Sequence, residues 1–416
     1  MSAAGQAPGR RRDGLFLVAS IALPIPWVLA HGFGGLEDAH ALIALCSGLA
    51  ILGGAFMISW SCELAERDIP QSLAILVLAL ASVLPEYAVD LHFAWTAGKD
   101  PSYAPYAVAN MTGANRLLIG LGWAAVVLVA CHRSGQRVLE VEANQRLELR
   151  FLIWATLYSF FIPMGGTIGL HDAAILLLFF FAYVYAALHG DTQEVELAGP
   201  PAWIEQRYGP RGCRRWALGL FLFAVYAIFL AAEPFAESLV HIGRNTGIDE
   251  FLLVQWVAPL ASESPEFVIA ILFALKLRGS IGLGALISSK VNQWTLLVGA
   301  IPITYAISLG GLKGLPLDER QVEELLLTSA QSLLAAIMLS DLRISRREAL
   351  GLALLFGAQL VFPSTAARWW FIWLYLALAA VYLCIPSQRR HFLRLLFSSP
   401  VAGRARDGGS FSSDAG

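Results

Sequence analysis

Two short stretches of the chain place a proline directly before a glutamate within long apolar runs. Residues 81–86 read ASVLPE, and residues 261–266 read ASESPE. A proline inside a helix removes a backbone hydrogen bond and frees the carbonyl group four residues earlier. The glutamates that follow, Glu86 and Glu266, place a carboxylate beside this freed backbone. Oxygen ligands of this kind suit hard cations such as Na⁺ and Ca²⁺.

Each stretch also carries a hydroxyl group one turn before its glutamate, at Ser82 and Ser262. A charged carboxylate at the centre of a bilayer costs about 2.5–3.5 kcal/mol on insertion scales, and such residues usually have a function. The alternative is that each glutamate forms a structural ion pair with a neighbouring basic group. The duplication of the whole pattern favours a cation site with Glu86 and Glu266 at its centre.

The composition places these stretches in a membrane. Hydrophobic residues make up 57% of the 416 residues and charged residues only 14%, with a mean hydropathy of +0.62. Soluble domains carry about 25% charged residues, so this chain cannot cover a water-facing surface. The net charge of −2 gives no indication of a nucleic-acid partner.

The elements that must position the two glutamates are membrane-spanning helices. A spanning helix needs about 20 mostly apolar residues, and this criterion predicts an all-α polytopic protein with about 12 transmembrane helices. The predicted ranges are 14–31, 40–60, 70–97, 104–131, 150–164, 167–188, 216–240, 250–277, 281–309, 323–341, 347–362 and 368–386.

Basic residues test this count because cytoplasmic loops carry an excess of Lys and Arg. With the N-terminus in the cytoplasm, about 22 of the 29 basic residues fall on the cytoplasmic side. We therefore predict an even number of helices with both termini cytoplasmic. The first apolar run follows Arg12 without a convincing cleavage site, so we predict a retained helix rather than a signal peptide.

In this topology the two copies of the proline-glutamate pattern cross the membrane in opposite directions. Inverted repeats of this kind are a common plan for secondary transporters. We predict two inverted five-helix repeats with an extra helix at each end. The predicted organisation is a cytoplasmic N-terminus (1–13), an additional helix (14–31), a first repeat (40–188), a cytoplasmic loop (189–215), a second repeat (216–362), an additional helix (368–386) and a cytoplasmic tail (387–416).

A second pair of stretches follows the first pair, with VANMTGAN at 108–115 and, more weakly, LGALISSK at 283–290. Together with ASVLPE and ASESPE, these stretches resemble the motifs of the calcium/cation antiporter superfamily, the membrane region of sodium/calcium exchangers. The resemblance covers roughly residues 40–365. It implies transport by alternating access, with Na⁺ or protons exchanged for Ca²⁺ and no tightly bound cofactor.

The same resemblance assigns roles to individual residues. Glu86 and Glu266 would be the central cation carboxylates. Ser82 and Ser262 would supply hydroxyl or carbonyl oxygens, and Asn110 would complete the site.

The chain departs from the family pattern in its neutral oxygen ligands. Val83 stands where a hydroxyl group is expected, and Ala285 replaces an Asn or Asp of the second half. Glu263 takes the position that corresponds to Val83 and adds a carboxylate to the expected cation ligands.

Basic residues also enter the predicted site. Lys290 stands where the family has an Asn, and Arg116 directly follows Asn115. An ammonium group near Glu266 or Glu263 would act as a tethered cation, which would change the stoichiometry or replace Na⁺ by protons. The alternative is a static pair of Lys290 with Glu263 that only shapes the site. The sequence leaves both hypotheses open.

Three further carboxylates have less defined roles. Asp90 lies one turn beyond Glu86 and would support the site or line a vestibule. Glu233 and Glu237 lie one turn apart on one helix face. They would line an ion path or lie in solvent near the membrane interface.

We therefore predict a secondary active antiporter that exchanges Ca²⁺ for Na⁺ or H⁺. One alternative is a monovalent cation/proton exchanger of the same fold, in which Lys290 and Glu263 replace a bound cation. The other is a non-transporting membrane sensor or enzyme, although the spans offer no catalytic set of side chains. The expected partners are transported cations and membrane lipid, without nucleic acid or an obligate protein partner. The compact architecture suits a bacterial inner membrane.

Overall fold

The computed structural model describes residues 10–33, 39–65, 84–188, 197 and 199–397. Its helices are α1 (Arg10–Ala22), α2 (Ile25–Phe33), α3 (His40–Ala65), α5 (Leu84–Lys99), η1 (Pro101–Tyr103), α6 (Ala104–Leu117), η2 (Leu118–Trp123), α7 (Ala124–Ser134), η3 (Ala143–Gln145), α8 (Arg146–Ser159), η4 (Ile162–Gly165), α9 (Leu170–Leu188), α10 (Pro200–Thr246), α11 (Glu250–Leu275), α12 (Gly279–Asn292), η5 (Gln293–Leu297), α13 (Val298–Leu309), α14 (Glu319–Met338), η6 (Leu339–Asp341), α15 (Arg346–Val361), α16 (Thr365–Cys384) and α17 (Pro386–Phe397). The short strands are β1 (Val138–Glu140), β2 (Thr167–Ile168), β3 (Leu315–Pro316) and β4 (Arg343–Ser345).

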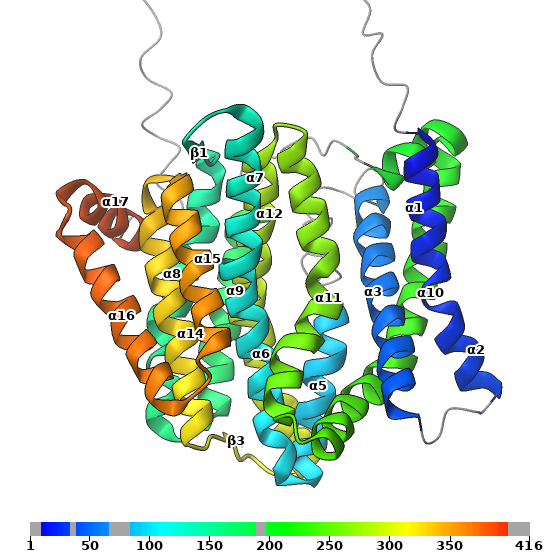
Figure 1. The fold of residues 1–416 in the computed structure, drawn as a ribbon, viewed down its shortest axis with the longest axis horizontal. Helices are drawn as coiled ribbons and strands as arrows, with labels where there is room; N and C mark the ends of the chain where they lie inside the picture. Colours follow the sequence, from blue (N-terminus) through cyan, green and yellow to red (C-terminus); the bar gives the residue numbers. More distant parts are fainter. Residues whose placement is uncertain (1–9, 34–38, 66–83, 189–196, 198, 398–416) are drawn as a thin grey trace, which may run out of the picture.

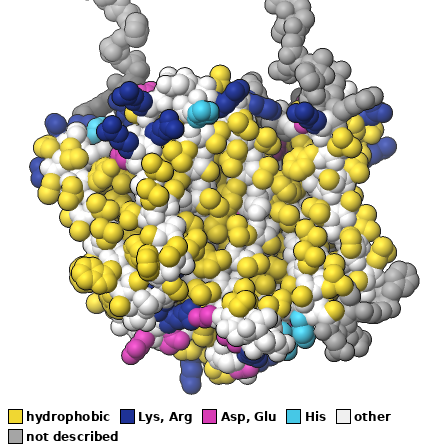
Figure 2. Space-filling view, viewed as in Figure 1, with side chains coloured by type: hydrophobic (Ala, Val, Ile, Leu, Met, Phe, Trp, Pro, Cys, Tyr) yellow, Lys and Arg dark blue, Asp and Glu magenta, His cyan; other side chains and the backbone are white. Residues whose placement is uncertain are grey.

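The long helices stand side by side and run between two opposite ends of the molecule (Figure 1). A broad band of hydrophobic side chains covers the visible face, and Lys and Arg side chains gather mainly along its upper edge (Figure 2). Within the described residues, nine helices are long and apolar enough to cross a membrane. The prediction of an all-α polytopic membrane protein is confirmed to this extent.

A described helix overlaps each of the twelve predicted ranges. The exact number of helices that cross the bilayer stays a prediction, because α5, α12–α13 and α15 do not satisfy the length and hydropathy criterion. Two helical segments lie where the sequence analysis expected a loop and a tail. The first turns of α10 begin at Pro200, and α17 lies within residues 387–416 apart from its first residue.

Two segments share an unusual helical layout. The α6–η2–α7 segment has a 14-residue α-helix, a π-helical stretch and an 11-residue α-helix, and the α12–η5–α13 segment has lengths of 14, 5 and 12 residues in the same order. π-Helical turns often occur at functional sites, because the widened backbone redirects the side chains that follow.

The strands pair at opposite ends of the bundle. β1 pairs with β4, and β2 pairs with β3, both antiparallel. β1 follows α7 and β3 follows α13, whereas β2 follows α8 and β4 follows α14. Figure 1 shows β1 at the upper end and β3 at the lower end. Corresponding strands of the two halves therefore lie at opposite ends of the molecule.

The backbones of α6 and α11 approach each other closely. Pro259 lies inside α11 and has no N–H group, so it leaves the carbonyl group of Gln255 without its helical donor. Gly113 of α6 packs directly on this carbonyl, since a Cβ atom there would lie 1.8 Å from the Gln255 oxygen. Small residues at helix crossings permit this kind of approach in membranes.

We expect Gly113→Ala to force α6 and α11 apart, because a backbone carbonyl cannot move aside as a flexible side chain can. Overpacking of this kind costs at least about 1–3 kcal/mol. The measurement is the thermal unfolding midpoint of the purified protein in detergent, which should fall. Gly351→Ala in α15 is the matched control, because a Cβ atom there meets nothing within 4 Å. Equal midpoints for the two variants would contradict the close approach.

Candidate functional site

One glutamine side chain joins a carboxylate from each half of the chain. The Nε2 atom of Gln293 donates to Oε1 of Glu86 at 2.7 Å and to Oε1 of Glu263 at 3.2 Å. Glu86 lies in the first turn of α5, Glu263 lies in α11, and Gln293 is the first residue of the π-helical stretch η5. All three side chains are almost completely buried.

Two further carboxylates lie near this pair. The charges of Glu263, Glu266 and Asp90 all act on the carboxylate of Glu86. Asp90 lies one turn beyond Glu86 on the same face of α5 and is fully buried. Glu266 is only partly buried. Four carboxylates therefore lie within electrostatic range of one another in a region of low dielectric, where their mutual repulsion is strong unless cations or protons compensate it.

Many oxygen atoms of this cluster have no hydrogen-bond partner. These buried atoms are Oε2 of Glu86, Oε2 of Glu263, Oε2 of Glu266, both carboxylate oxygens of Asp90, Oδ1 of Asn110 and Oε1 of Gln293. Buried polar atoms are normally hydrogen-bonded, and unsatisfied ones point to an ion, a water molecule or a function. Carboxylate and amide oxygens are the ligands that Ca²⁺ takes in proteins. The donor set thus fits a hard cation.

The amide group of Gln293 lies between the carboxylates of Glu86 and Glu263 and bonds to both. Within the described residues, no three acidic, His or Cys side chains are grouped closely enough to hold a metal ion as they stand. Rotation of the amide would direct its Oε1 atom, in place of Nε2, toward the space between Glu86 and Glu263. The same side chain can therefore stabilise the carboxylates without a cation or add an oxygen ligand to one.

The neutral residues predicted for the site differ in their roles. Asn110 is buried on α6, with Oδ1 free of partners. Ser262 is buried beside Glu263, but its hydroxyl group donates within α11 to the carbonyl groups of Ala258 and Pro259 at 3.3 and 3.4 Å. Ser82 lies outside the described residues.

Lys290 is fully buried and bonds to Asn115. Its Nζ atom donates to the Asn115 carbonyl oxygen at 3.0 Å and to Oδ1 at 2.8 Å, and it lies 4.9 Å from the centre of the Trp294 ring. Among the described residues, no ion pair within 4.0 Å joins Lys290 to a carboxylate. The charge of Lys290 still acts on Glu263. The structure therefore places the ammonium beside the carboxylates without a direct pair.

Arg116 points away from the carboxylate cluster. Its guanidinium group bonds to Glu324 of α14, donates to Gln359 of α15 at 3.3 Å and stacks 4.9 Å from the centre of the Trp256 ring. A cavity of about 310 Å³ lies beside this group. Arg368 of α16 borders the same cavity.

Arg368 extends this network to the last transmembrane helices. Its Nε atom donates to Glu323 at 2.7 Å and lies 3.8 Å from Glu324. Gln255 also donates to Glu324 at 3.0 Å. Two arginines and two glutamates thus compensate each other, and they connect α6, α11, α14, α15 and α16.

Glu237 holds α10 against α5 and η1. Its carboxylate accepts a hydrogen bond from Tyr103 at 2.6 Å and lies 3.1 Å from Nε2 of His92. His92 is two residues beyond Asp90, a spacing that puts the two side chains on different faces of α5. Glu237 therefore joins helices away from the carboxylate cluster. Glu233, one turn earlier, is exposed on α10.

The sequence analysis missed Gln293 and Glu324. Gln293 follows Asn292 within the predicted span 281–309. Two adjacent polar residues inside a membrane span usually have a function, and this was the sequence signal that could have identified Gln293. Glu324 lies near the start of its helix, within the acidic segment that begins at Glu319, where glutamates are expected at an interface. Nothing in its spacing pointed to Arg116, which is 208 residues away.

Comparisons with known proteins identify the family of this chain. The family model described as sodium/calcium exchanger protein matches residues 39–189 and 216–365. The structure of the H⁺/Ca²⁺ exchanger CAX is 44% identical with a TM-score of 0.87, and the match covers 92% of this chain and 96% of that chain. No curated protein matches this chain.

Two more distant structures share the fold. Native YfkE is 14% identical with a TM-score of 0.60, over 90% of this chain and 99% of that chain. The sodium-calcium exchanger NCX_Mj soaked with 100 mM Na⁺ and 10 mM Sr²⁺ is 17% identical with a TM-score of 0.52, over 82% of this chain and 99% of that chain. At this level of identity the likeness concerns the fold alone.

We expect Arg116→Gln to destabilise the protein strongly, because Glu324 would keep a buried charge without its main partner. Breaking a buried pair costs about 3–5 kcal/mol, whereas removal of both charges costs much less. The double variant Arg116→Gln/Glu324→Gln should therefore regain most of the unfolding midpoint lost in the single variant.

The exposed pair of Arg343 and Glu140, 3.0 Å apart, offers the matched control. Arg343→Gln should change the midpoint little, since exposed pairs contribute about 0–1 kcal/mol. If Arg116→Gln behaves like Arg343→Gln, the buried network does not stabilise the fold.

Proposed function

The chain belongs to the sodium/calcium exchanger protein family and is a multi-pass cation antiporter, and we propose that it exchanges Ca²⁺ for protons at the Glu86–Glu263–Gln293 centre. Protons are proposed as the counter-ion because the relative with 44% identity is an H⁺/Ca²⁺ exchanger. The alternative of a monovalent cation/proton exchanger gains no support from the comparisons.

The observation that carries this proposal is the bridge from Gln293 to one carboxylate of each half. When Ca²⁺ binds, the amide rotates and its oxygen joins those of Glu86 and Glu263 around the cation. When Ca²⁺ leaves, protons neutralise the same carboxylates, because the neighbouring carboxylates repel each other. Ca²⁺ and protons thus compete for the same oxygen atoms, and this competition couples their movements.

The two halves of the chain supply the symmetry that alternating access needs. We propose that residues 40–188 and 216–362 are inverted repeats. The equal order of α-helical and π-helical segments in α6–η2–α7 and α12–η5–α13 supports this assignment. The reversed positions of the corresponding strands at the two ends of the bundle support it as well. Rocking of one repeat against the other would then expose the site to each side in turn.

We place the protein in a bacterial inner membrane with both ends in the cytoplasm. α1 begins at the upper end of the molecule and α17 also lies there (Figure 1). The basic side chains concentrated along the same edge fit the cytoplasmic side (Figure 2). The helices α1–α2 and α16 are the additions that flank the proposed repeats.

Glu86→Gln and Glu263→Gln should each lower Ca²⁺ flux driven by a pH gradient in proteoliposomes. Loss of one charged ligand is worth about 1.5–3 kcal/mol, which corresponds to roughly a 10- to 100-fold loss of affinity. Glu140→Gln, which changes an exposed glutamate, is the matched control. Full activity in both site variants would show that the proposed centre does not bind the transported cation.

We propose further that Lys290 acts as a tethered cation for this cluster. Its ammonium group is held by Asn115 and acts on Glu263 without pairing to it. When Lys290 is protonated, its charge leaves less uncompensated negative charge for a second transported cation. Lys290 therefore favours coupling to protons over coupling to Na⁺.

Lys290→Asn should make Ca²⁺ flux sensitive to a Na⁺ gradient, because the cluster would lose its fixed positive charge. The measurement is Ca²⁺ uptake into proteoliposomes under separate Na⁺ and pH gradients. Lys276→Asn, which changes a basic residue just beyond the end of α11, is the control. If Ca²⁺ uptake by Lys290→Asn responds to the Na⁺ and pH gradients as it does in the unsubstituted protein, Lys290 does not act as a tethered cation.

A further inference from the structure

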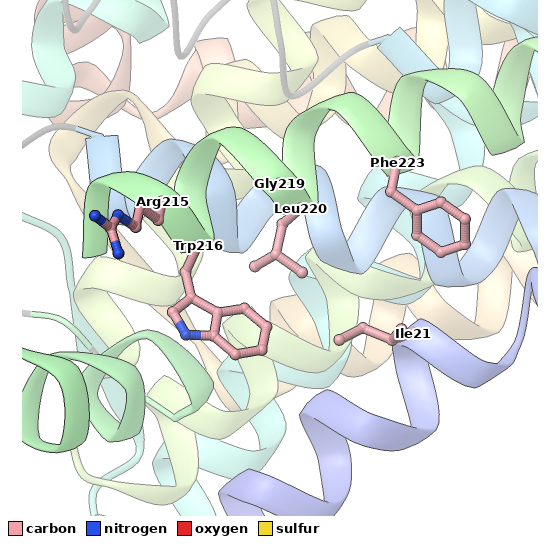
Figure 3. Close-up of a pocket in the computed structure, with 6 residues that line it drawn as sticks. All are labelled: Ile21, Arg215, Trp216, Gly219, Leu220 and Phe223. Carbon is pink, nitrogen blue, oxygen red and sulfur yellow. The ribbon is translucent and has the colours of Figure 1, made fainter. Parts of the chain in front are cut away.

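A groove of about 260 Å³ lies between α1 and α10. Figure 3 shows Trp216, Leu220 and Phe223 of α10 on one side and Ile21 of α1 on the other. Arg215 lies at one end of this row of side chains (Figure 3). The lining is mainly apolar and contains one charged residue.

The groove is separate from the carboxylate centre. Its residues come from α1, which precedes both proposed repeats, and from the part of α10 before Pro234. None of the carboxylates that meet at Gln293 borders it. The α10 residues on either side of Gly219 include the exposed Leu218 and Leu222, at 61% and 58%. This exposed apolar surface faces lipid in a membrane.

Gly219 lies in the middle of this groove, and no close contact within the protein requires a glycine there. Glycine inside a helix costs about 1 kcal/mol relative to alanine, so it is usually retained for close packing. A Cβ atom at Gly219 would meet nothing within 4 Å, in contrast to Gly54 of α3, which packs closely against Ile228 of α10. The missing side chain at Gly219 therefore leaves open space within the groove.

Arg215 supplies a charge at the end of the groove. It is exposed, and no carboxylate of the described residues lies within 4.0 Å of it. It stands just before the long apolar part of α10, residues 216–232. This is the depth at which basic side chains meet phospholipid headgroups.

We propose that this groove binds an anionic phospholipid. The phosphate group pairs with Arg215, and one acyl chain lies along Trp216, Gly219 and Phe223 against Ile21. From Arg215 to Phe223 the helix rises by ~12 Å, enough to cover a large part of an acyl chain. The lipid fills the space between the additional helix α1 and α10.

The test is native mass spectrometry of the purified protein, titrated with phosphatidylglycerol and with phosphatidylcholine. The unsubstituted protein should prefer phosphatidylglycerol. Arg215→Gln should lower that preference about fivefold, the factor that corresponds to roughly 1 kcal/mol for one basic residue near a lipid surface. Gly219→Leu should weaken the binding of both lipids severalfold, because its side chain would occupy the groove.

Gly351→Leu is the matched control, since it adds the same side chain to a helix glycine that is also free of contacts within 4 Å. It should bind both lipids like the unsubstituted protein. Gly219→Ala fills less of the groove and gives a second variant if Gly219→Leu fails to fold. Lipid binding unchanged in both Gly219 variants would overturn the proposal. Equal affinity for the two lipids would overturn it as well.

Discussion

The proposed transport centre depends on one hydrogen-bonded amide between two carboxylates. Glu86 and Glu263 come from helices 177 residues apart in sequence, and both point to Nε2 of Gln293. Without a donor between them, two buried carboxylates would repel each other strongly. An amide is the suitable partner, because it offers either N–H groups or an oxygen atom at the same place. The side chain that stabilises the site can therefore also join a cation.

This arrangement requires helices that approach each other and change their course near the site. Pro259 frees a carbonyl group in α11, and Gly113 allows α6 to pack directly on it. The π-helical stretch that begins at Gln293 follows the α-helix that carries Lys290. The local features that weaken a regular helix thus occur in the helices that carry the carboxylate cluster and the Arg116–Glu324 network.

Of two neighbouring buried basic residues, Lys290 lies beside the carboxylate cluster and Arg116 points away from it. Lys290 bonds to Asn115, and the next residue of α6, Arg116, bonds to Glu324 in a different direction. One charge thus acts on the proposed transport centre, whereas the other is compensated within a structural network. This division explains how two basic residues of similar depth can have different consequences when they are changed.

The sequence by itself determined the class of the protein and part of its proposed site. Composition and the length of the apolar runs predicted a polytopic helical protein, and the duplicated proline-glutamate pattern singled out Glu86 and Glu266. These inferences succeed because the membrane imposes length and hydropathy on every helix. The local pattern could not reveal that Glu263 is the direct partner of Gln293, that Lys290 bonds to Asn115, or that Arg116 is held by Glu324. Only the tertiary structure decided these pairs, because contacts between distant helices depend on how the helices pack and turn, and residue spacing within one helix does not encode that.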